Sequence, residues 1–88
     1  MTSYFFEIEH AKEYGVNEAI MLSNLLFWIR KNRANEKHQH DGKTWTYNSR
    51  KAYAELFPFW SERQCRGVLE SLVKQNVIIA GNFNKLPM

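Results

Sequence analysis

The 88-residue chain has a single cysteine, Cys65, which excludes an internal disulfide framework and a zinc site built from several cysteines. A lone cysteine is typical of a reducing compartment, so a cytoplasmic location is expected. With two prolines and four glycines the composition is not that of a disordered chain. No run approaches the roughly 20 apolar residues of a membrane span, and the start lacks the basic flank of a signal peptide. We therefore expect a soluble protein with no membrane partner.

The chain is rich in the residues that build a core and uneven in its charge. Hydrophobic residues make up 44% of the sequence and aromatic residues 15%, enough for one domain over residues 1–88. The net charge is +3. Residues 1–42 hold five Lys or Arg against six Asp or Glu, whereas residues 43–88 hold seven against three. The second half is therefore where a phosphate backbone would be met.

The N-terminal part has a helical pattern of apolar residues. Residues 4–14 are expected to form either a strand-like arm or a short amphipathic helix that ends at Gly15. Asn17 is expected to cap a long helix over residues 18–33, with Val16 and Met21 as a hydrophobic staple.

The apolar surface of helix 18–33 is wider than one stripe. Its core face is formed by Leu22, Leu25, Leu26 and Ile29. Phe27 and Trp28 lie outside this stripe and are apolar as well. Either the helix is central and packed from several sides, which we favour, or Phe27 and Trp28 belong to an oligomer interface.

The middle of the chain is expected to hold a loop and a short strand. Residues 31–43 are rich in turn formers, with Asp41 and Gly42 in a tight turn, so a solvated loop is predicted. Residues 44–47 alternate β-branched and aromatic side chains, which is typical of a strand. A strand just before a helix pair suggests a three-stranded sheet.

Two capped helices are predicted next. Ser49 is a good N-cap for a helix over residues 50–57. Ser61 and Gln64 have the spacing of a capping box, which starts a helix over residues 62–75. One face of this second helix is apolar and carries Cys65, Val68, Leu69, Leu72 and Val73. Its other face carries Arg63, Arg66, Gly67, Glu70 and Lys74.

The order of these elements predicts a winged helix. Residues 77–80 are expected to form a buried strand and residues 81–85 the turn of a wing. The fold class is therefore α+β and mainly helical, a winged helix-turn-helix with a small antiparallel sheet. The helix-turn-helix is expected at residues 49–75 and the wing at 77–88.

Residues for DNA recognition are expected at the start of helix 62–75. Arg63 and Arg66 share a face there, and arginine pairs with guanine through two hydrogen bonds. Gln64 could bind adenine, but the capping box competes for its side chain. Phosphate contacts are expected from Asn48, Ser49, Arg50, Lys51, Lys74 and Lys85. Any one of these charges is more often a solvated surface residue, so their combination carries the prediction.

Other features of the sequence are given structural interpretations. Gly67 costs a helix about 1 kcal/mol relative to alanine, which suggests a close approach of a backbone or a neighbouring helix, or simple tolerance. The turn aromatics Phe57, Phe59 and Trp60 are expected in the core. His38 and His40 have too few accompanying ligands for a metal site. Because no nucleophile, base and orienting residue form a recognisable set, we expect no enzyme activity and no cofactor.

The segments TYNSRKAYAELFPFWSERQ (46–64) and LVKQNVIIAGNFNK (72–85) carry a resemblance to a known family. Together they resemble the N-terminal winged-helix domain of phage and plasmid replication proteins, the replisome-organiser and DnaD-like group. The resemblance implies binding of origin, forked or single-stranded DNA, self-association, and recruitment of helicase-loading proteins. It places the recognition role on Arg63 and Arg66, and backbone contacts on Arg50, Lys51 and Lys85.

Three functions are thus expected as alternatives. The first is the DNA-binding module of a replication initiator, and the second is a protein-interaction winged helix that dimerises through helix 18–33. The third is a transcriptional regulator, which shares DNA binding with the first. Members of the resembled group continue past the wing with a further basic strand and a C-terminal domain, so the chain is expected to be an N-terminal fragment of a longer protein.

Overall fold

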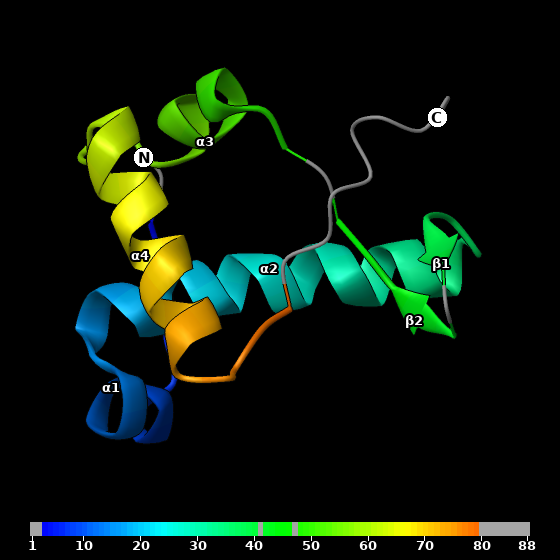
Figure 1. Cartoon of the computed structure of the whole chain (residues 1–88), viewed down its shortest axis with the longest axis horizontal. Coiled ribbons are helices and arrows are strands. Elements are labelled where there is room, and N and C mark those ends of the chain that lie inside the picture. Colours follow the sequence, from blue (N-terminus) through cyan, green and yellow to red (C-terminus); the bar gives the residue numbers. More distant parts are fainter. Residues whose placement is uncertain (1–2, 41, 47, 80–88) are drawn as a thin grey trace.

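The computed structural model describes residues 3–40, 42–46 and 48–79 (Figure 1). The described part is mainly helical. Its elements, in chain order, are α1 (Ile8–Tyr14), α2 (Val16–Ala34), β1 (Gln39–His40), β2 (Lys43–Thr44), α3 (Arg50–Leu56) and α4 (Glu62–Lys74). None of these helices has the combination of length and apolar character that crossing a bilayer demands.

The joint between α1 and α2 is a single glycine. Gly15 closes α1 by donating its N–H to the Ala11 carbonyl at 3.0 Å, and its own carbonyl accepts from Ala19 N–H at 2.9 Å to open α2. Its φ of 114° is one that side chains rarely allow. Of the two alternatives predicted for residues 4–14, the short helix that ends at Gly15 is formed, over residues 8–14 alone. The predicted Asn17 cap is wrong, because Gly15 makes the turn and α2 starts at Val16 with no side-chain cap.

Helix α2 is the central element of the fold. Figure 1 shows α1 and α4 against one end of α2 and the β1–β2 hairpin beside its other end, in agreement with the inter-element contacts. Four residues of α2 are buried, namely Ala19, Met21, Leu22 and Leu25. The prediction of a central core helix is therefore confirmed, with bounds a little wider than expected. The predicted staple is not formed, because Val16 lies within α2 and is exposed.

The loop predicted over residues 31–43 is wrong at both ends, because residues 31–34 belong to α2 and a hairpin begins at Gln39. Strands β1 and β2 pair antiparallel, with Gln39 opposite Thr44, and Gly42 lies between the strands with a φ of 71°. The strand predicted over residues 44–47 is wrong in its bounds, since β2 ends at Thr44 and residue 47 lies outside the described part. The Trp45 carbonyl accepts from Asn32 Nδ2 of α2 at 2.8 Å. After Thr44 the chain therefore contacts α2 and leaves the sheet, which has two strands in the described part.

Helices α3 and α4 share one core with α2. The side chains that are most completely buried in this core are Met21 of α2, Phe57 after α3, and Cys65 and Leu72 of α4. The buried face predicted for helix 62–75 is confirmed, with Val68 buried and Leu69 packed against the cluster. Because α4 buries one face, its opposite face is left to solvent.

The segment after α4 is not a strand in the described residues. Asn76 takes a φ of 62° and donates its N–H to the Val73 carbonyl, while Val77 N–H donates to the Leu72 carbonyl at 2.9 Å. These two bonds form a Schellman motif with asparagine in the left-handed position. The predicted strand at 77–80 is therefore wrong for residues 77–79, which close α4 with Val77 on the core. Residue 80 and the predicted wing turn 81–85 lie outside the described residues.

Candidate nucleic-acid interface

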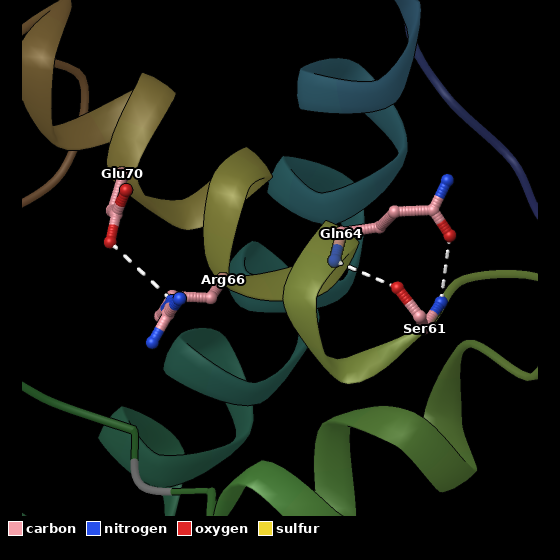
Figure 2. A network of polar contacts seen from close by, with 4 residues as sticks. All are labelled: Ser61, Gln64, Arg66 and Glu70. Atoms are coloured by element: carbon pink, nitrogen blue, oxygen red, sulfur yellow. Dashed lines mark hydrogen bonds and ion pairs between the residues drawn. The ribbon is translucent and has the colours of Figure 1, made fainter.

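The start of α4 is held by a complete capping box (Figure 2). Gln64 N–H donates to Ser61 Oγ at 3.1 Å, and Ser61 N–H donates to Gln64 Oε1 at 2.8 Å. Both bonds satisfy backbone donors that a helix start leaves without partners. The first turn is consequently fixed. The Gln64 side chain has a structural task, so its predicted contact with adenine would require the box to open.

The two arginines of the predicted site lie on the exposed side of α4. Arg63 and Arg66 are both exposed, whereas Cys65 between them is buried. Figure 2 shows Arg66 directed toward Glu70 and away from the capping box. The Arg66 Nε and Glu70 Oε1 atoms are 3.7 Å apart, and both side chains are more than half exposed. Such a pair contributes little to stability and leaves Arg66 able to take another anionic partner.

The polar residues before α3 are less available than the sequence suggests. The Ser49 hydroxyl accepts from Ala52 N–H at 3.1 Å, which confirms Ser49 as the N-cap of α3. Burial raises the pKa of Tyr53, and the hydrogen bond from Asn48 partly offsets this shift. Asn48 is therefore engaged with a half-buried tyrosine. Lys51, in the first turn of α3, is exposed and open to a phosphate.

The remaining predicted basic residues are spread widely. Arg50 is the first residue of α3, and Lys74 is exposed in the last turn of α4. A cation at a helix C-terminus also interacts favourably with the helix dipole, so Lys74 has a structural role as well. Lys85 lies outside the described residues.

An aromatic cluster supports the turn between α3 and α4. The Phe57 ring is buried and lies 5.0 Å from Trp60 and 5.8 Å from Tyr4, centroid to centroid. The Tyr4 hydroxyl donates to the Leu56 carbonyl, which fastens the N-terminal arm to the end of α3. Phe57 and Trp60 pack in the core as predicted. Phe59 differs, since it is 50% exposed although its ring contacts those of Tyr4 and Trp60.

The buried thiol of Cys65 is not an activated nucleophile. Burial raises the pKa of Cys65, and the nearby Glu62 carboxylate raises it further. The Sγ atom lies 3.8 Å from the Tyr53 carbonyl. No group of three or more His, Cys, Asp or Glu side chains that could hold a metal ion occurs within the described residues.

An apolar cavity of about 410 Å³ lies between α2, the end of the hairpin and α4. Its walls are mainly aliphatic, with Trp45 and Tyr53 as the aromatic contributors and Lys43 as the charged one. This lining lacks an acid and base pair. It offers an apolar space without evident chemistry.

Comparisons with protein-family models, with curated proteins and with solved structures find no match for this chain.

Proposed function

We propose that this chain is the DNA-binding winged-helix domain of a phage- or plasmid-type replication initiation protein. In this proposal residues 1–88 are a single domain, α3 and α4 are its helix-turn-helix, and α4 is the recognition helix. One observation carries the proposal: a capping box fixes the start of α4 while Arg63 and Arg66 project from its exposed side. The proposed activity is binding to DNA, and no catalytic step is proposed.

The physical argument is that α4 has the two properties a recognition helix needs. Its inner face is held in the core by Cys65, Val68 and Leu72, so the helix keeps its orientation when a partner binds. Its N-terminal end carries arginines, which can bind guanine edges in the major groove. Lys51 and Lys74 extend the basic surface for phosphate contacts, which supply much of the affinity for DNA.

The role in replication rests on the resemblance of segments 46–64 and 72–85 to replication proteins. That resemblance also supplies the proposed helicase-loading partners. A transcriptional regulator would use the same α4 surface, so the interface and its test are common to both roles.

Fluorescence anisotropy with labelled duplex and single-stranded DNA at several salt concentrations tests the proposal. We expect salt-sensitive binding that an Arg63→Ala/Arg66→Ala variant loses. The matched control is Lys12→Ala/Arg33→Ala, which removes the same charge from exposed positions on α1 and α2. An equal loss of DNA binding in both double variants would mean that net charge alone explains the effect. Full binding by Arg63→Ala/Arg66→Ala would refute the assignment of the interface to α4.

A second candidate function is self-association through the α1–α2 surface. Phe5 is 79% exposed, Ile8 67% and Phe27 58%. A groove of about 620 Å³ borders Phe5 and Phe27, with Glu7 and Arg30 in the same lining. A second copy could pair Glu7 with Arg30 across a two-fold axis. Trp28, predicted with Phe27 as interface, is half-buried beneath Lys31 Nζ at 5.1 Å and is less available.

Sedimentation of Phe27→Glu tests this second candidate. A concentration-dependent dimer of the wild-type chain that Phe27→Glu abolishes, with helical content unchanged, would support it. A wild-type chain that sediments as a monomer at every concentration would exclude it.

A further inference from the structure

Gly67 occupies the middle of α4, where glycine is the least favourable residue after proline. Replacing alanine by glycine in a helix interior costs about 1 kcal/mol. Seven residues of α4 follow Gly67 before the C-cap Gln75, so end effects do not explain the glycine. Its backbone is helical, with none of the positive φ values found at Gly15 and Gly42. Conformation therefore gives no reason for glycine at this position.

Packing inside the chain gives no reason either. Apart from its chain neighbours and the backbone of α4 itself, a Cβ atom built on Gly67 meets no heavy atom of the described residues within 4 Å. The close approach predicted from the sequence is thus absent within the described part of the chain. The space above Gly67 is open to solvent and available to a partner.

The neighbours of Gly67 indicate what kind of partner would use that space. Helical spacing places Arg63 one turn before Gly67 and Lys74 two turns after it on the same exposed face. All three residues are exposed, with Glu70 beside them. Gly67 is therefore a gap between two long basic side chains. A polyanion that contacts both of them would pass directly over the glycine.

We propose that Gly67 is the point of closest approach between α4 and DNA, an inference that rests on the proposed function. Gly67 follows Arg63 by about 6 Å along the helix, which is within the roughly 12 Å width of the major groove. With Arg63 at the base edges, the backbone at Gly67 lies inside the groove. A methyl group there holds α4 away from the groove floor and lengthens the contacts of Arg63.

Replacement of Gly67 is expected to affect the stability of the free protein and its binding to DNA differently. Gly67→Ala raises the helical propensity of α4 and fills no occupied space, so the free protein becomes more stable. In the complex the same methyl group crowds the interface between α4 and DNA, so the affinity for duplex DNA falls on the order of tenfold. Gly67→Leu, also a good helix former, weakens binding more than Gly67→Ala. The change in stability and the change in affinity thus have opposite signs.

The control is Asn76→Gly, which relieves the positive φ of 62° at the end of α4 without adding an atom to the exposed face. It stabilises the same helix, so it reports what stiffening alone does to binding. Melting temperature and anisotropy with a short labelled duplex of mixed sequence are measured for the wild type and the three variants.

The expected result is that Gly67→Ala melts at or above the wild-type temperature and binds more weakly, Gly67→Leu binds more weakly still, and Asn76→Gly binds like the wild type. Equal or tighter binding by Gly67→Ala and Gly67→Leu overturns the inference and leaves the proposed function standing. A wild-type chain that shows no salt-sensitive binding overturns the proposed function and this inference with it.

Discussion

Helices α2 and α4 pack on the same core but expose surfaces of different chemical character to solvent. The outer face of α4 carries Arg63, Arg66 and Lys74, and the inner face is apolar. Helix α2 also has a buried side, with Met21 and Leu25, but its exposed side is not wholly polar, since Phe27 lies there. An exposed charge is stable in water without a partner, whereas an exposed apolar patch, such as Phe5 and Phe27 in one groove, gains from being covered. The two proposed partners differ accordingly, an anionic one for α4 and an apolar one for α2.

The largest expected effect comes from breaking the core that both helices share. Leu72→Ala on α4 and Met21→Ala on α2 each remove a fully buried side chain and should lower the free energy of unfolding by about 2–5 kcal/mol. Phe27→Ala, on the exposed side of α2, should cost about 1 kcal/mol at most. Urea denaturation measures all three. A large loss for Phe27→Ala would contradict the division into inner and outer faces.

Helix α4 starts with a side-chain cap, whereas α2 starts without one. Ser61→Ala removes the side-chain cap of α4 and should lower stability by about 1 kcal/mol. Asn17→Ala should change stability by roughly 0.5 kcal/mol or less, because Asn17 is an exposed residue inside α2 and caps nothing. Thermal unfolding of both variants is the measurement. If Asn17→Ala proved the more damaging change, the start of α2 would lie where the sequence first indicated.

A smaller effect is expected at high pH, on the inner side of α4. Burial raises the pKa of Cys65 and of Tyr53, so the folded chain keeps protons that the unfolded chain has lost. Their contribution to stability is complete below the unfolded pKa values and declines as pH rises above about 8.5, the ordinary pKa of a thiol. Melting temperatures between neutral and alkaline pH should therefore fall, and fall less in Cys65→Ala. The same decline in that variant would remove Cys65 as a cause.

The smallest stability effect is expected on the outer face of α4. Glu70→Gln breaks the exposed pair with Arg66 and should cost about 0.5 kcal/mol or less. If the proposal holds, DNA binding should become tighter, because the change frees Arg66 and removes a negative charge from the surface proposed to face phosphates. Anisotropy against the wild type measures this gain, and weaker binding would mean that Glu70 itself contacts DNA.

Features that depend on a few adjacent residues could be predicted from the sequence. The caps at Ser49 and Ser61 need partners three residues away, so spacing alone was sufficient. The apolar face of α4 followed from its period for the same reason. For the candidate site, the sequence located Arg63 and Arg66 on the exposed side of this helix.

Features decided by distant contacts could not be predicted. Strand β2 ends where Asn32 binds the Trp45 carbonyl, a contact between residues far apart in the chain. Val77 was assigned to a strand by its composition, but the left-handed turn at Asn76 folds it back onto Leu72. The tie from Tyr4 to Leu56 had no sequence signal, because a tyrosine hydroxyl can serve any carbonyl nearby.

The central claim is that the outer face of α4 is the surface that meets DNA. Titration of the isotope-labelled protein with a short duplex, followed by amide chemical shifts, tests it most directly. We predict shifts concentrated on residues 61–67 and Lys74, with Phe5, Ile8 and Phe27 unchanged. Shifts centred on Phe5, Ile8 and Phe27, with α4 unaffected, would contradict the account and move the interface to the apolar side of the molecule.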